Sequence, residues 1–316
     1  MNPVSPKEAS GLWRLYHQCL KDGDTNLALK CARRGVHFCS HERDMKQAGI
    51  WQRAVANCLF LRGRYEQAVA AARRACDKQP DDFERALSYI QVGAFLPYLD
   101  KCDEAFRFFD LAAELMKAFP NDSYLQMHFF GARALARRRT GDFVWALIDW
   151  EGAAYATRRV GLIWRAAGYI NNIGLLFAKM GELESGERRL REALEMLEED
   201  PHPHTEACIK DSLGHVLFLK GDHVNALRLL KAAAESFTKL GDNSQLGPTL
   251  FHLAELHEEL GGYSKARDEA TRAFKLARKL KNSELGANAL ELLDRLPKWA
   301  EEPEFVYELN GTAEFG

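Results

Sequence analysis

The segment Gly63-Arg64-Tyr65-Glu66-Gln67-Ala68, followed by Ala75 and Pro80, contains the pattern that decides the fold. A glycine is followed by two small residues seven positions apart, and a proline then closes the segment. A seven-residue step returns to nearly the same face of an α-helix, and glycine and proline favour helix ends. The segment therefore predicts a tight turn, a helix with a narrow face of small residues, and a loop.

The same punctuation recurs about every forty residues, which indicates internal repeats. Turn glycines stand at Gly23, Gly63, Gly141, Gly181, Gly221 and Gly261, and Asp100 occupies the remaining turn. Five positions after each turn is a small residue: Ala28, Ala68, Ala105, Ala146, Gly186, Ala226 or Ala266. Small residues also precede six of the seven turns, at Ala56, Gly93, Ala134, Gly174, Gly214 and Ala254. A second series separates the units, at Pro80, Pro120, Gly161, Pro201 and Gly241.

This register predicts pairs of antiparallel helices, because two helices approach closely only where side chains are small. Each unit is expected to contain helix A, a turn with a left-handed glycine, helix B and a short loop. Asp24, Asp142 and Asp222 are expected to cap their B helices. The predicted fold is an all-α solenoid of about seven units within residues 1–281, at residues 5–40, 41–80, 81–120, 121–160, 161–200, 201–240 and 241–281. A capping helix is expected at 282–296, followed by an acidic aromatic tail at 297–316.

The third unit departs from this pattern. Asp100 replaces the turn glycine, and Pro97 stands in the last turn of helix A. Proline cannot donate a backbone hydrogen bond and disfavours helix before it. We therefore expect this helix to kink or to end early, as a local bend of the solenoid or as a binding feature.

The overall composition is that of a core-forming protein with little net charge. The chain has 316 residues with 43 Lys and Arg, 45 Asp and Glu, and a net charge of -2. This balance gives no strong field toward nucleic acid or an anionic membrane. The first ten residues lack an apolar signal region, and no apolar run is long enough to span a membrane. Seven cysteines without a Cys-x-x-Cys pair favour reduced core thiols, so the expected location is cytoplasmic.

Together, these residues resemble the tetratricopeptide repeat. The family pattern has a small residue in helix A, a turn glycine, an aromatic residue two positions later, and two alanines in helix B, as at Gly63, Tyr65, Ala68 and Ala75. The forty-residue period is longer than the common 34 and is similar to that of kinesin light chain, LGN-type adaptors and several bacterial regulators. The resemblance covers about nine-tenths of the chain and implies a right-handed α-solenoid.

The resemblance also implies a peptide-binding surface. In the long-repeat arrays, paired asparagines on helix A bind the backbone of an extended peptide, and Asn171-Asn172 is the one full pair here. The candidate peptide- or partner-binding residues are Arg53, Asn57, Gln91, Arg138, Trp164, Arg165, Asn171, Asn172, Asp211, His215 and His252. The alternative is that these residues form only the solvated inner wall of the solenoid.

Other kinds of site have less support. Arginine pairs, such as Arg33-Arg34 and Arg73-Arg74, invite a nucleic-acid interpretation, but nearby carboxylates and the lack of interleaved aromatics favour a solvated face. The histidines of His202-Pro203-His204 and the pair Asp211 and His215 do not form a known metal-ligand string. No phosphate-binding loop, nucleophile elbow or metalloprotease motif is present, so we expect no cofactor and no enzymatic activity.

The expected function is a non-catalytic scaffold that binds an extended peptide or a partner helix in the concave groove. The alternative is a regulatory sensor whose array binds a peptide or small molecule and controls a partner such as a transcription or signalling protein. The tail carries Glu301, Glu302, Glu304, Glu308 and Glu314 among aromatic residues. It resembles a peptide ligand that can dock near Arg138 and Arg165, in its own chain or a second copy; the alternative is a loosely packed terminus.

Overall fold

The structure is a computed structural model that describes residues 6–21 and 23–297. The described residues form α-helices and one 3-10 helix, and they contain no strand, as the sequence predicts. None of the described helices is long and apolar enough to cross a membrane. The chain divides into two compact units, residues 1–169 and 170–316, and the division falls within helix α9.

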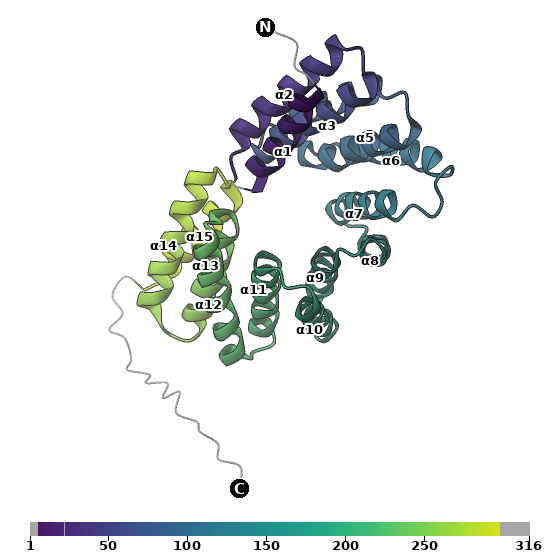
Figure 1. Cartoon of the computed structure of the whole chain (residues 1–316). Coiled ribbons are helices and arrows are strands. Elements are labelled where there is room, and N and C mark those ends of the chain that lie inside the picture. The colour runs from purple at the N-terminus through teal and green to yellow at the C-terminus, as the bar shows by residue number, and fades with distance from the viewer. Residues whose placement is uncertain (1–5, 22, 298–316) are drawn as a thin grey trace. The chain divides into compact units, whose positions relative to one another are not determined.

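Unit 1 is a series of helices joined by short turns and loops (Figure 1). They are α1 (Pro6–Lys21), α2 (Thr25–His41), α3 (Met45–Leu61), α4 (Tyr65–Lys78), α5 (Asp82–Phe95), η1 (Leu96–Leu99), α6 (Cys102–Met116), α7 (Ser123–Thr140), α8 (Phe143–Arg159) and the first part of α9 (Ile163–Lys179). Unit 2 continues with the rest of α9. Its further helices are α10 (Leu183–Glu199), α11 (Pro203–Leu219), α12 (His223–Leu240), α13 (Asn243–Glu259), α14 (Tyr263–Leu280) and α15 (Ser283–Arg295).

Within each unit, helices contact their neighbours in the chain, and the odd-numbered helices also contact one another. Thus α3 contacts α5 and α5 contacts α7 in unit 1, while α11 contacts α13 and α13 contacts α15 in unit 2. The odd-numbered helices therefore form one row in each unit, and the even-numbered helices pack against it. Such nearest-neighbour packing defines a helical solenoid.

Left-handed glycines make the turns, as predicted. Gly63, Gly141 and Gly221 have φ of 68°, 82° and 83°, a region that side-chain-bearing residues rarely adopt. Asp24 and Asp222 cap the following helices by accepting backbone N–H bonds. The predicted cap at Asp142 is wrong, because its side chain makes no such bond. Val144 and Trp145 in the first turn of α8 are exposed, so water can satisfy their amides.

Small residues create the close helix crossings that the sequence indicates. A Cβ atom added to Gly174 on α9 would lie 2.6 Å from Cγ of Leu190 on α10, and the matching distance from Gly214 to Leu230 is 2.8 Å. In unit 1, Gly35 on α2 accepts the ring of Trp51, which is 3% exposed. A leucine or tryptophan side chain therefore fills the space that each glycine leaves.

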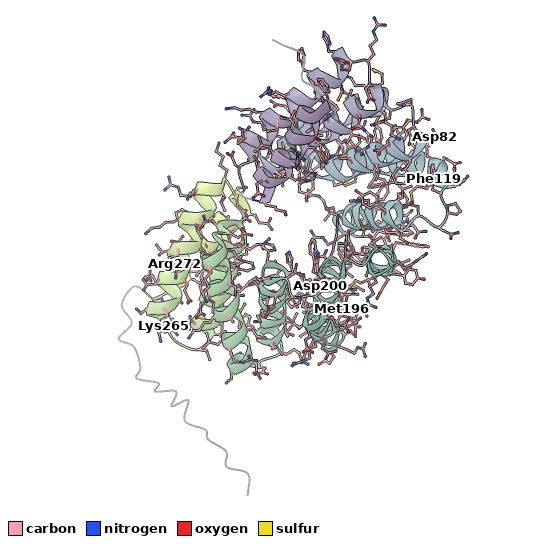
Figure 2. The ribbon with its side chains drawn as sticks, viewed as in Figure 1. Asp82, Phe119, Met196, Asp200, Lys265 and Arg272 are labelled. Carbon is pink, nitrogen blue, oxygen red and sulfur yellow. The ribbon has the colours of Figure 1, made fainter. Side chains whose placement is uncertain are left out.

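The third unit ends its first helix early, as expected. Helix α5 stops at Phe95, and η1 follows with Pro97 in its first turn. Asp100 has the left-handed conformation (φ 56°) that glycine adopts at the other turns. At the other end of α5, Figure 2 shows Phe119 near Asp82, and the Phe119 ring packs edge-on against Phe83 with centroids 5.5 Å apart. The Phe119 contact thus joins the start of α5 to the loop that follows α6.

Candidate peptide-binding rows

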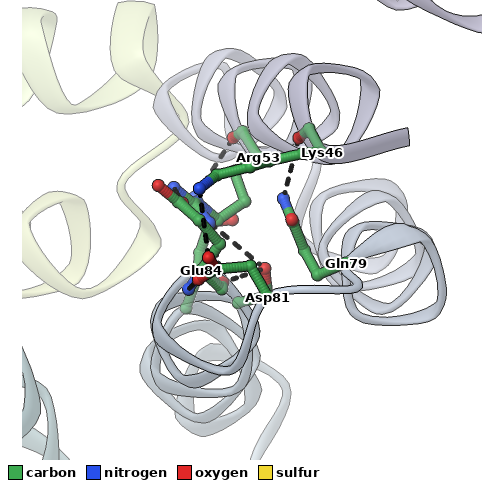
Figure 3. Close-up of polar contacts among 7 residues, drawn as sticks. Lys46, Arg53, Gln79, Asp81 and Glu84 are labelled. Atoms are coloured by element: carbon green, nitrogen blue, oxygen red, sulfur yellow. Dashed lines mark hydrogen bonds and ion pairs between the residues drawn. The ribbon is translucent and has the colours of Figure 1, made fainter. Parts of the chain in front are cut away.

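Arg53 on α3 is the first of the candidate binding residues along the row of odd-numbered helices in unit 1, and it bonds to the next repeat (Figure 3). Its guanidinium donates to the Glu84 carbonyl oxygen at 2.8 Å, to Ser88 Oγ at 3.4 Å and to the Glu84 carboxylate. Both partners are on α5, and the Arg53 and Glu84 side chains are each 16% exposed. Arg53 therefore already has protein partners and joins two repeats.

Two further predicted residues also have partners inside the fold. The Gln91 amide donates to the backbone oxygen of Arg53 at 3.1 Å, while its own Oε1 is buried without a partner. Asn57 bonds to the phenol of Tyr16, whose pKa burial raises to about 12. Of these groups, the Gln91 oxygen is the fully buried one that lacks a hydrogen bond with the described residues.

The positive end of the unit 1 row lies around Arg165 on α9. Arg165 is half-buried and forms no ion pair with a described residue. It lies close enough to His128 on α7 that burial, together with Arg165 and Arg53, lowers the pKa of His128 to about 4. His128 is therefore neutral at pH 7, and Arg165 carries the charge. Trp164 precedes it and is half-buried, and Arg138 is exposed near the end of α7 without a described ion-pair partner.

The row in unit 2 begins with the asparagine pair on α9. Asn171 is 8% exposed, and its side chain forms no hydrogen bond with a described residue. A buried amide oxygen without a partner costs roughly 1–3 kcal/mol. Asn172 follows and is half-buried, likewise without a described partner.

Asp211, His215 and His252 come together on α11 and α13. Asp211 Oδ1 lies 3.2 Å from His252 Nδ1, and the rings of His252 and His215 stack in parallel with centroids 4.3 Å apart. Burial opposes charge on His252, but Asp211 outweighs it and raises the pKa of His252. Burial and the charged neighbour His252 lower the pKa of His215 to about 4. The cluster therefore pairs one histidine that favours the charged form with one that is neutral at pH 7.

A second polar group lies one turn along α11. His204 Nε2 is 2.9 Å from Asp242 Oδ2, and His204 Nδ1 is 3.9 Å from Cys208 Sγ. Burial raises the pKa of the Cys208 thiol to about 12, so it is no ready nucleophile at pH 7. Across the described part of the chain, no three potential ligands are arranged to hold a metal ion.

Sequence reasoning missed the partners of the row residues. Opposite charges stand 31 to 41 positions apart, about one repeat, and pair between neighbouring repeats: Arg53 with Glu84, Lys46 with Asp81, Lys220 with Glu187, Asp211 with His252, and Glu258 with Arg295. A search for opposite charges at the repeat spacing was the signal that could have found them. The same search offers Glu198, Glu199 and Asp200 to Arg165, so the spacing alone does not separate Arg165 from Arg53.

These features define a helical-repeat protein with a polar row in each unit. Residues 205–279 match the tetratricopeptide repeat model. This match identifies tetratricopeptide repeats within residues 205–279, and the other described helices continue the same helical-repeat fold. A comparison with curated proteins finds no significant match.

Solved structures share the fold at low sequence identity. A signal-transduction ATPase with a tetratricopeptide repeat sensor from Pyrococcus horikoshii has a TM-score of 0.65 at 16% identity. The match covers 92% of this chain and 46% of that protein, so this chain spans less than half of it. The apo quorum sensor NprR from B. thuringiensis has a TM-score of 0.62 at 13% identity, covering 91% and 80%. A Rap protein complexed with Competence and Sporulation Factor has 0.58 at 13%, covering 92% and 97%.

Proposed function

We propose that the chain is a non-catalytic scaffold that binds an extended peptide along its rows of odd-numbered helices. The observation that carries the proposal is that these rows keep polar groups that have no hydrogen-bond or ion-pair partner among the described residues. They are the guanidinium of Arg165 in unit 1 and the amides of Asn171 and Asn172 in unit 2. A peptide backbone offers the N–H and C=O groups that the two asparagine amides lack.

The charge of the unit 1 row favours an acidic peptide. Arg165 and Arg138 have no carboxylate partner among the described residues, and neutral His128 adds no positive charge. A carboxylate beside a half-buried arginine gains a charge-assisted, bidentate hydrogen bond. The acidic tail, which lies outside the described residues, can supply such a peptide, either to its own chain or to a second copy.

Several structural relatives support this kind of function. The relatives named above include a quorum sensor, a Rap protein in complex with a signalling factor, and a protein with a tetratricopeptide repeat sensor. These names also favour a second candidate function for this chain, a regulatory sensor that changes shape on binding. The absence of a cofactor and a cytoplasmic location remain predictions.

The peptide proposal is tested with the double variant Asn171→Ala/Asn172→Ala. Partners are captured from native lysate by the wild-type chain, and their binding segments are synthesised as peptides. The affinities of these peptides are measured by fluorescence anisotropy. We expect the double variant to lose about tenfold in affinity, as for two lost hydrogen bonds. Asn288→Ala, at an exposed position of α15, is the matched control. Equal affinities of the two variants would reject the row of unit 2 as the binding surface.

A loss of affinity in this double variant would not be caused by a loss of stability. Asn171 makes no hydrogen bond to described residues, so its replacement removes an unpaired buried amide and does not break a hydrogen bond. We expect thermal stability to stay the same or rise. Small-angle scattering with and without the captured peptide separates the two functions, because only a sensor must change its dimensions.

A further inference from the structure

A cleft of about 410 Å3 opens in unit 1 between α2, α3 and α4. Helix α3 contributes Gln52, Val55 and Leu59 to it. At 100° per residue, these positions lie on the side of α3 roughly opposite Arg53 and Asn57. The cleft is therefore separate from the row proposed to bind a peptide, and its volume falls in the range of about 300–1,000 Å3 common for ligand sites.

The floor of the cleft is apolar and its rims are positively charged. Val55 and Leu59 are 5% and 3% exposed, and Val36 packs beside them from α2. Arg33 on α2 and Arg74 on α4 line the two sides. The sequence favours a solvated face for these arginines, with carboxylates nearby in the chain. Both arginines are exposed and form no ion pair with any described residue.

Arg73 on α4, next to Arg74, does have an ion-pair partner, so the lack of a partner is not common to the arginines of this helix. Arg73 on α4 pairs with Glu104 of the next repeat, and its guanidinium lies 5.3 Å from the ring centroid of Phe108. Arg74 is the next residue, but it is aimed at the cleft instead. Two uncompensated cations thus flank one apolar depression, an arrangement that attracts an anion with an apolar part.

An amide side chain also lines the cleft, independently of charge. Gln52 is only 6% exposed, and its side chain lines the cleft without a hydrogen bond to any described residue. Its amide atoms are not among the fully buried polar atoms that lack a partner, so water reaches them, and a ligand that displaces this water must supply a donor or an acceptor. A hydrocarbon alone would leave this amide unpaired, whereas a peptide bond satisfies it.

We propose that this cleft is a second binding site, for a peptide of a partner protein that carries one large apolar side chain between acidic residues. The apolar side chain packs on Val36, Val55 and Leu59. The adjoining peptide group bonds to the Gln52 amide, and the carboxylates on either side pair with Arg33 and Arg74. The site requires charge complementarity on both sides of the buried side chain.

The test uses the full chain and immobilised nonapeptides with a central phenylalanine flanked on each side by two glutamates. Companion peptides replace the glutamates with glutamine or the phenylalanine with alanine. We expect the full chain to bind the acidic phenylalanine peptide at least about fivefold more tightly than either companion, and less tightly as salt rises. Equal binding of all three peptides would overturn the proposal.

Variants then locate the binding. Arg33→Glu/Arg74→Glu should remove the preference for acidic peptides, whereas Arg107→Glu/Arg272→Glu, which changes exposed arginines on α6 and α14, should leave it intact. Ala70→Trp places a bulky side chain on an exposed lining residue of the cleft and should block binding without a change of charge. Circular dichroism melts verify that each variant folds. If the Arg33/Arg74 and Arg107/Arg272 variants bind alike, the site is not this cleft.

The row and the cleft are distinguishable in the same assay. Asn171→Ala/Asn172→Ala should leave binding of the acidic phenylalanine peptide unchanged, because those residues belong to unit 2. A loss in that variant would assign the peptide to the row and overturn the second site. If an amphiphilic small carboxylic acid, decanoate, binds as tightly as the peptide and needs Arg33 and Arg74, the occupant is not a peptide and the proposal fails.

Discussion

The buried carboxylate of Asp149 joins helices α7 and α8 through two arginines. It is 1% exposed, and it accepts bonds from Arg133 Nε and Nη2 at 2.9 and 2.7 Å and from Arg137 Nη1 at 2.8 Å. Asp149→Ala would leave both guanidiniums without this partner. Loss of one member of a buried ion pair costs about 3–5 kcal/mol. Because the Arg133 and Arg137 side chains are 24% and 17% exposed and can turn toward water, we expect about 3 kcal/mol.

Two further variants separate charge burial from packing. Asp149→Asn keeps one acceptor and should cost less, about 2 kcal/mol. Arg133→Met/Arg137→Met/Asp149→Leu removes the charges together and should lie within about 1 kcal/mol of wild type. The control is Asp110→Ala, an exposed carboxylate on α6 without a described partner.

The assay must resolve regions of the chain, because solenoid repeats can unfold separately. Urea unfolding followed by circular dichroism gives the total loss, and hydrogen exchange with mass spectrometry locates it. We expect faster exchange in α7 and α8 and unchanged exchange in α13 and α14 of unit 2. If Asp149→Ala costs no more than Asp110→Ala, the carboxylate does not stabilise this helix pair.

Three further predictions follow from the glycines, the histidines and the row. Gly174→Ala should destabilise by about 1–2 kcal/mol in urea, because its Cβ meets Leu190, whereas Gly168→Ala on the same helix meets nothing within 4 Å and should stabilise by up to about 1 kcal/mol. The pKa of His215 is about 4 in the folded chain, so the unfolded chain binds more protons between pH 4 and 6.5. Stability should therefore fall by roughly 2 kcal/mol as the pH drops through that window. His215→Phe should remove this loss, which is measured by denaturation at pH 4.5 and 7.5. Arg165→Glu should weaken acidic row-binding peptides about tenfold and flatten their salt dependence, and an unchanged anisotropy titration would contradict this.

The sequence predicted the helices and turns because each depends on residues close together in the chain. Gly141 needs only its own left-handed conformation to end α7, and the forty-residue spacing repeats that signal. Pro97 similarly ends α5 through local backbone chemistry. These features follow from backbone rules that hold whatever lies nearby.

The functional groups depended on side-chain choices that no local rule fixes. Arg53 and Arg165 look alike in the sequence, yet Arg53 bonds to Glu84 one repeat away and Arg165 has no described partner. Arg137 belongs to the basic last turn of α7, yet its side chain turns inward to Asp149. Each outcome is set by which carboxylate of a neighbouring helix comes within reach.

The division into two units has a practical consequence for spectroscopy. Trp13, Trp51, Trp145, Trp150 and Trp164 all belong to unit 1, and the sixth tryptophan is Trp299 in the tail. In a Trp299→Phe chain, intrinsic fluorescence would therefore report unit 1 alone, with Trp51 and Trp150 buried as sensitive probes. Circular dichroism follows the helices of both units. Comparison of the two signals would show in which order the two units unfold, without any added label.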